Sequence, residues 1–232
     1  MYLTTESKRK ENVDLASGII IQGQTMKINY VTISREYGSG GREVGRKLAD
    51  KLGIPLYDKE IIEQTAFKTG FAEDYVKKQG EYASARNWIE YSFSARNSYG
   101  MSPEDYLWAK QREVILDLVA KGPCVLVGRC ADYILRDRTD VLNVFIHADI
   151  EKRKHRITEI YKEPENTDKM LKDMDKKRKF NYRYYTEQEW GKCQNYDLTL
   201  DSGSLGIDHC VDIIYHICQD DEVEKTPKPA EE

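Results

Sequence analysis

The stretch ISREYGSGGREVG, from Ile33 to Gly45, constrains this chain more than any other. It overlaps the end of an alternating apolar run, Ile28 to Ser34, and leads into a helical pattern with Val44, Leu48 and Leu52 on one face. A strand, a glycine-rich turn and a helix in this order direct backbone N–H groups and a helix N-terminus towards one spot. The sequence therefore predicts a turn that binds an anion such as a phosphate.

The turn departs from the usual phosphate-binding pattern, G-x-x-x-x-G-K-[ST]. If Gly40 is the last glycine, Gly41 takes the lysine position and Arg35 that of the first glycine. If Gly41 is the last glycine, Arg42 takes the lysine position and Glu36 that of the first glycine. Arg42 would supply a cation, although a forked guanidinium is not equivalent to an ammonium group. From the sequence, both registers stay open.

Apolar runs that alternate with helical patterns define the predicted fold. Three further runs are typical of buried strands: 124–127 (CVLV), 141–148 (VLNVFIHA) and 196–202 (YDLTLDS). Between the strands lie helical patterns, one of which has Ser102 as N-cap and Pro103 in its first turn. Strands that alternate with helices predict an α/β fold of three layers with a mainly parallel sheet.

The predicted organisation is one domain between two tails. Residues 1–26 are mostly polar and are expected to form a flexible extension. Residues 219–232 are charged and contain proline, which predicts a disordered tail. The domain then covers residues 27–218. Within it, the helical stretch 60–120 is longer than one crossover between strands needs, and predicts an added lobe rich in aromatic side chains.

Composition limits the partners and the compartment. The chain has 36 basic and 40 acidic residues and a net charge of −4, so no overall basic bias indicates nucleic acid. No apolar run approaches the roughly 18 residues of a membrane span, and the N-terminus lacks the order of a signal peptide. The five cysteines form no C-x-x-C pair, which is typical of reduced thiols. A cytoplasmic protein is expected.

Basic and acidic residues follow the predicted strands, where ligands bind in parallel α/β sheets. Arg129 and Asp132 come after the strand at 124–127, and Arg153 comes after the strand at 141–148. Further arginines of this region are Arg156, Arg178 and Arg183. An anion-binding turn surrounded by arginines suits phosphoryl transfer, because that chemistry depends on positioning and on neutralising charge at the phosphate.

On these residues the sequence resembles the cytidylate kinase-like family of P-loop nucleotide kinases. The similar segments are VTISREYGSGGREVGRKLADKLGIPLYDKEII, CVLVGRCADYIL, VFIHADIEKRKHRI and DKKRKFNYRYY followed by YDLTLDS. They occur in the family's order over most of residues 27–218. The resemblance implies a P-loop kinase core, a helical substrate lobe at 60–120 and an arginine-rich lid, expected at 149–187.

The resemblance also implies roles for individual residues. Gly128 and Arg129 match a family motif that contacts the pyrimidine nucleotide, but Cys130 replaces its aspartate, which makes Asp132 a candidate stand-in. Glu43 stands where the family has a threonine, so the magnesium ligands stay unassigned. The predicted phosphate-binding residues are Gly38, Ser39, Gly40, Gly41, Arg42 and Glu43; the predicted catalytic residues are Arg42, Arg153, Arg178 and Arg183; the predicted substrate-binding residues are Asp58, Arg129 and Asp132. Asp58 has an equal alternative role, as the N-cap of the following helix.

The expected function is transfer of a phosphoryl group from ATP, with Mg²⁺, to a nucleoside monophosphate such as CMP or dCMP. Two alternatives stay open. The missing lysine and Cys130 also suit a nucleotide-binding or sensing protein with little or no kinase activity, and the acceptor could be another small metabolite. Nucleotides are the expected partners, without nucleic acid or membrane, and the aromatic lobe offers a surface for a homodimer.

Overall fold

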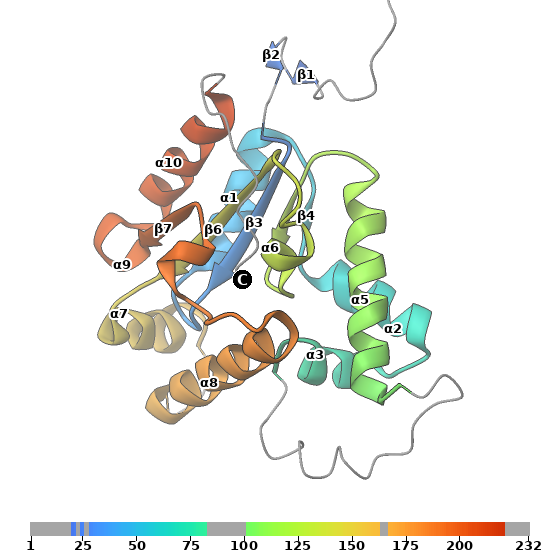
Figure 1. Cartoon of the computed structure of the whole chain (residues 1–232). Helices are drawn as coiled ribbons and strands as arrows, with labels where there is room; N and C mark the ends of the chain where they lie inside the picture. The colour runs from blue at the N-terminus through green and yellow to red at the C-terminus, as the bar shows by residue number, and fades with distance from the viewer. Residues whose placement is uncertain (1–19, 22–23, 26–27, 83–100, 163–166, 221–232) are drawn as a thin grey trace, which may run out of the picture.

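The computed structural model describes residues 20–21, 24–25, 28–82, 101–162 and 167–220 of the chain. Most of the predicted extension 1–26 and nearly all of the predicted tail 219–232 lie outside these residues. The same holds for residues 83–100 of the predicted lobe. Within residues 27–218, the predicted domain, the structure shows a central sheet and the helices around it (Figure 1).

Five parallel strands form the central sheet. Their order across the sheet is β4 (Leu56–Tyr57), β5 (Cys124–Val127), β3 (Tyr30–Arg35), β6 (Val141–His147) and β7 (Leu198–Asp201). The sheet has β3 at its centre, where Tyr30 pairs with Cys124 on one side and with Val141 on the other. Two short strands near the N-terminus, β1 (Ile20–Ile21) and β2 (Gln24–Thr25), form a separate antiparallel pair. The predicted parallel sheet is therefore confirmed.

Helices cover both faces of the sheet (Figure 1). On one face, α1 (Gly41–Leu52) and α10 (Ile207–Gln219) pack their apolar residues against the strands. On the other face lie α2 (Lys59–Thr69), α5 (Pro103–Val119) and the short α6 (Ala131–Ile134). Each face has its own apolar core, so the three layers of the predicted α/β fold are confirmed.

The helical lobe is built from α2, α3 (Glu73–Tyr82) and α5. Helix α5 begins as predicted, because the Ser102 side chain accepts a hydrogen bond from the N–H of Asp105. None of the helices in the described part of the chain is long and apolar enough to cross a membrane. All five cysteines are free thiols, in agreement with the sequence.

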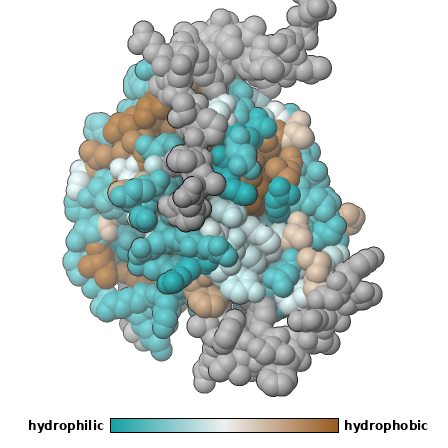
Figure 2. Space-filling model, viewed as in Figure 1, coloured by the Kyte–Doolittle hydropathy of each residue, from teal (hydrophilic) through white to brown (hydrophobic). Residues whose placement is uncertain are grey.

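The segment between β6 and β7 crosses the carboxyl ends of the strands (Figure 1). It contains α7 (Ile150–His155), a π-helical turn (Arg156–Ile160), α8 (Thr167–Thr186) and a 3₁₀ turn (Cys193–Asn195); α9 (Ser202–Leu205) follows β7. On α8 the buried residues are Leu171, Arg178, Asn181, Tyr182 and Thr186. This spacing turns one face inward and leaves a hydrophilic outer face, visible at the lower left of Figure 2.

Candidate active site

The glycine turn joins β3 to α1 at the carboxyl edge of the sheet. Gly38 and Gly40 have φ angles of 77° and 82°, in the left-handed region that favours glycine. A Cβ atom on Gly38 would lie 2.9 Å from Cδ1 of Ile157, and one on Gly40 would lie 2.5 Å from Cδ1 of Ile207. Backbone conformation and packing account for both glycines without a ligand, so the glycines alone do not indicate an anion site.

The start of α1 is the second feature of this edge. Among the described residues, no side chain caps this helix after Gly40, and the same is true of α2 and α10. The nearest hydroxyl, that of Ser39, instead donates towards the backbone oxygens of Glu36 and Ile146, at 2.9 and 3.1 Å. The first-turn N–H groups and the positive end of the helix dipole therefore remain suited to a phosphate.

Arg153 holds the turn against α7 and α8. Its Nε donates to the backbone oxygen of Tyr37 at 2.7 Å, and its Nη1 lies 3.1 Å from the Glu36 carboxylate. Its Nη2 forms an ion pair with Asp175, which also accepts a 2.8 Å hydrogen bond from the N–H of Tyr37. The Arg153 side chain is only 7% exposed. In this conformation it fixes the shape of the turn, and its predicted catalytic role stays a prediction.

Arg42 forms an ion pair across the carboxyl edge of the sheet. Its Nε lies 2.5 Å from Oδ2 of Asp58, the residue that follows β4. Arg42 is 58% exposed at its side chain, whereas the Asp58 side chain is 10% exposed. Asp58 occupies the N-cap position of α2 but its side chain makes no capping hydrogen bond. The proposed contact of Arg42 with a phosphate is not part of this arrangement and stays a prediction.

The carboxylates around the turn are paired with cations. Glu43 lies 3.3 Å from Nη1 of Arg156 and 3.8 Å from Nζ of Lys47, while Glu36 and Asp175 share Arg153. No group of three acidic, histidine or cysteine side chains in the described ranges is arranged to hold a metal ion. Mg²⁺ commonly needs only one or two protein carboxylates, together with water and the phosphates of a substrate. Glu36, Glu43 and Asp175 are the carboxylates nearest the turn that could supply them.

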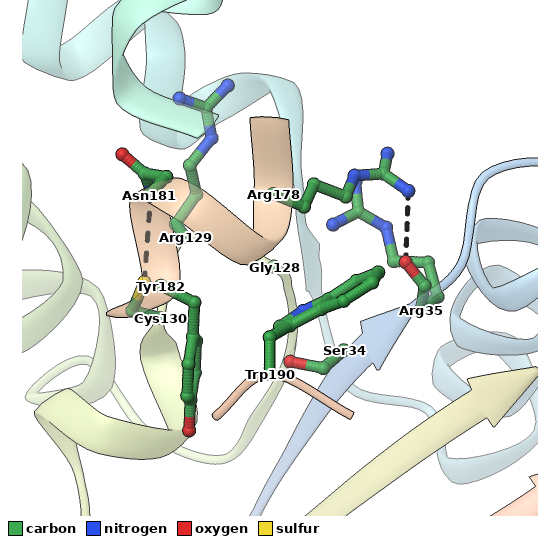
Figure 3. A pocket seen from close by; sticks show the side chains of 9 residues that line it. All are labelled: Ser34, Arg35, Gly128, Arg129, Cys130, Arg178, Asn181, Tyr182 and Trp190. Atoms are coloured by element: carbon green, nitrogen blue, oxygen red, sulfur yellow. Dashed lines mark hydrogen bonds between the residues drawn. The ribbon is translucent and has the colours of Figure 1, made fainter. Parts of the chain in front are cut away.

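A small cavity lies where β3, β5 and α8 meet (Figure 3). Three arginines line it, together with an asparagine and two aromatic residues: Arg35, Arg129, Arg178, Asn181, Tyr182 and Trp190. Its volume is about 20 Å³, which is room for little more than one water molecule. The cavity as it stands is too small to enclose a nucleotide.

The three arginines of the cavity are buried, with exposures of 5% for Arg35, 3% for Arg129 and 6% for Arg178. Arg178 donates from Nη1 to the backbone oxygen of Arg35 at 2.9 Å, which ties α8 to the end of β3. Arg129 donates from Nη1 to the oxygens of Val76 and Gln111, both at 3.3 Å, and so connects the end of β5 to α3 and α5. Together they concentrate positive charge at the carboxyl edge, which favours a polyanion.

Asp132 and Tyr182 connect the strand side of the cavity to α8. The Tyr182 hydroxyl donates a 2.7 Å hydrogen bond to Oδ2 of Asp132, and both residues are buried. Burial, reinforced by the neighbouring Asp132 carboxylate, raises the pKa of Tyr182, so the phenol stays a donor. Arg129 and Cys130 both have left-handed backbone, with φ of 61° and 53°. Such strain in non-glycine residues concentrates at functional sites.

Comparisons with known proteins decide the family. The model of the cytidylate kinase-like family matches residues 30–204. The chain belongs to this family. Among solved structures, an uncharacterised protein from Eubacterium ventriosum ATCC 27560 is 28% identical, with a TM-score of 0.60, over 81% of this chain and 96% of that one. Shikimate kinase from Acinetobacter baumannii, in complex with shikimate, is 19% identical with a TM-score of 0.46, over 82% and 93% of the two chains. No curated protein matches significantly.

In this member of the cytidylate kinase-like family, the structure separates Arg183 from three other predicted arginines. Arg129 and Arg178 line the cavity, and Arg153 holds the turn beside it. Arg183 lies on the exposed face of α8. The difference follows from helical geometry, since residues five apart do not share one side of a straight helix.

Sequence reasoning missed Arg35, Asn181 and Trp190, which all line the cavity. Arg35 carries a signal that was present in the sequence, because it is a basic residue at the carboxyl end of a predicted strand. The same rule had selected Arg129. Asn181 lies three residues after Arg178, on the same face of α8, but an asparagine in a charged helix carries no signal of its own.

Proposed function

We propose that this member of the cytidylate kinase-like family transfers the γ-phosphoryl group of ATP to a nucleoside monophosphate such as CMP or dCMP. The observation that carries the proposal is the set of three buried arginines at the carboxyl ends of β3 and β5, beside the uncapped start of α1. Phosphoryl transfer needs this arrangement, since the charge of the transferring group is neutralised by fixed donors.

The arginines would act from different parts of the fold. Arg178 is carried by α8, so it reaches the phosphates only when this helix closes. Arg129 is held by α3 and α5, the lobe where the acceptor nucleotide would bind. Closing of α8, in the segment 149–187 that we assign as the lid, excludes water and so protects ATP from hydrolysis. The pyrimidine acceptor is supported by the match of Gly128 and Arg129 to the family motif.

An ADP-release assay with ATP and Mg²⁺ tests the proposal across nucleoside monophosphates. CMP and dCMP are expected to give the highest kcat/KM. Arg178→Ala should lower kcat/KM by about tenfold to hundredfold, the usual effect of losing a charge-assisted hydrogen bond. Lys179→Ala, on the exposed face of the same helix, is the matched control and should leave activity unchanged. Absence of turnover with every acceptor contradicts the proposal.

Gly41 at the lysine position, together with the paired carboxylates, favours one second candidate, a protein that binds nucleotides without efficient turnover. Calorimetry separates the two, because a sensor binds ADP or ATP while the ADP-release assay stays at background. A third outcome is selective turnover of another small hydroxylated or phosphorylated metabolite. Cys130, in place of the family's aspartate, is the residue that favours a changed acceptor.

A further inference from the structure

We propose that Arg35 is the phosphate-binding cation of the glycine turn. In the register where Gly40 is the last glycine of the pattern, Arg35 replaces the lysine that would stand at the position of Gly41. The ligand is the β- and γ-phosphate part of a nucleotide. This inference rests on the proposed function, because it assigns the residue that holds the nucleotide phosphates in the same site.

The first reason is steric exclusion between positions 35 and 41. A Cβ atom on Gly41 would lie 2.5 Å from Cβ and 2.9 Å from Cγ of Arg35. Both distances are shorter than real side-chain contacts, and Arg35 cannot shift easily at its Cβ. The stem of Arg35 therefore fills the space from which a lysine at position 41 would begin. The chain can therefore place a basic side chain at position 35 or at position 41, but not at both. In this protein the basic side chain is at position 35.

The second reason is the place of the guanidinium. Arg35 is the last residue of β3, directly before the turn, and it lines the cavity together with Arg178 (Figure 3). Its backbone oxygen accepts the hydrogen bond from Arg178, so closing of α8 also fixes Arg35. Arg42, the other candidate for the missing cation, does not line this cavity, and its side chain is 58% exposed.

The third reason is chemical. A guanidinium group donates two parallel hydrogen bonds to phosphate oxygens, whereas a lysine offers one mobile point charge. Arg35 approaches the phosphates from the strand end, and Arg178 approaches from α8. The two arginines then bracket the phosphates, and the loss of the lysine removes no positive charge from the site.

Calorimetric titration with ADP and with inorganic tripolyphosphate tests the assignment without requiring turnover. Arg35→Met keeps the length of the side chain and removes its charge, and it should weaken both ligands by about tenfold to hundredfold. Arg46→Met, on the exposed side of α1, is the matched control and should change binding less than about threefold. A loss with Arg42→Met and none with Arg35→Met overturns the assignment.

A rescue experiment keeps the test decisive if Arg35→Met does not fold. Arg35→Gly removes the stem and the charge, and should lose the same affinity. Adding Gly41→Lys to it recreates the pattern G-x-x-x-x-G-K and should recover at least tenfold of the lost affinity. Gly41→Lys alone forces the 2.5 Å contact and should lower the thermal unfolding temperature.

The two proposals fail in different ways. If the parent protein binds neither ADP nor tripolyphosphate, the proposed function fails, and the assignment of Arg35 fails with it. If the parent binds both ligands and every Arg35 variant binds them equally well, only the assignment of Arg35 is overturned.

Discussion

At the residue scale, Arg153 stabilises the conformation of the glycine turn. Its side chain contacts the backbone oxygen of Tyr37 and the carboxylates of Glu36 and Asp175. We predict that Arg153→Ala lowers the free energy of unfolding by about 3 kcal/mol, since it leaves largely buried acceptors without their cation. Lys154→Ala is the matched control. It removes ion pairs to the exposed Glu151 and Asp168 and should cost less than about 1 kcal/mol. Urea denaturation measures the free energy of unfolding of both variants. Equal losses would show that the buried contacts of Arg153 stabilise the fold no more than an exposed ion pair does.

Glu104, in the first turn of α5, predicts a dependence of stability on pH. Its Oε1 accepts a 3.3 Å hydrogen bond from Tyr75, and its Oε2 is buried without a hydrogen-bond partner among the described residues. Burial raises the pKa of Glu104 above its ordinary value of 4.5. The folded state therefore holds the proton more tightly, and stability falls as pH rises from the ordinary value through the folded pKa.

Glu104→Gln should remove this dependence. As pH increases from about 4.5, the free energy of unfolding of Glu104→Gln should rise relative to that of the parent. The reason is that the variant has no buried carboxyl group to ionise. Urea denaturation at several pH values between about 4 and 8 measures the difference. A constant difference over that range would mean that Glu104 ionises as easily in the folded state as in the unfolded chain.

At the residue scale, the sequence predicted Arg129 and Arg178 because their position after a strand or within a basic helix can be read directly. It did not predict the pairing of Arg42 with Asp58, which depends on how β4 and α1 meet in space. Nor did it predict the steric exclusion between positions 35 and 41, which depends on distances of less than 3 Å.

At the element scale, α8 is held in place by contacts to several elements, among them α3 and α7. Arg178 bonds to the end of β3, Tyr182 bonds to Asp132 of α6, and the Tyr185 ring stacks on Trp108 of α5 with centroids 4.3 Å apart. The helix is therefore a unit whose position depends on a few specific contacts. The exposed residues on the outer face of α8 contribute little to holding the helix in that position.

We predict that Tyr182→Phe weakens the closed position of α8. The change leaves the buried Asp132 carboxylate without the phenol donor, which costs about 1–3 kcal/mol. Amide exchange in α8 should become faster, while exchange in the core strand β6 changes less. Tyr184→Phe is the matched control, because Tyr184 is 42% exposed. Equal exchange in the two variants would show that the bond to Asp132 does not hold the helix.

Periodicity predicted the elements better than their details. The strand at 124–127 and the cap of α5 at Ser102 agree with the structure, since both depend on local sequence. The helix that begins at Ile150, by contrast, becomes a π-helical turn after His155. That turn holds the buried Ile157 against Gly38, a contact between distant segments that local periodicity cannot reveal.

At the scale of the whole molecule, helices cover both faces of the parallel sheet, and α8 lies across its carboxyl edge (Figure 1). The alternation of strands and helices predicted this architecture, but the order of the strands and the closed position of α8 depend on long-range packing. The cavity of about 20 Å³ beneath α8 cannot hold a nucleotide. If nucleotide phosphates bind beneath α8, as proposed, their binding includes opening and reclosing of this helix.

This requirement predicts that a bound nucleotide suppresses the opening of α8. If ATP with Mg²⁺ binds only beneath the closed helix, a free concentration of about 100 times Kd slows exchange that requires opening by about hundredfold. Hydrogen–deuterium exchange should show this slowing at the buried face of α8, around Asn181 and Tyr182. Amides around Val211 and Ile214 of α10, on the opposite face of the sheet from α5, serve as the internal control and should keep their rates. If α8 exchanges at the same rate with and without nucleotide, the segment 149–187 is not a lid over the nucleotide phosphates.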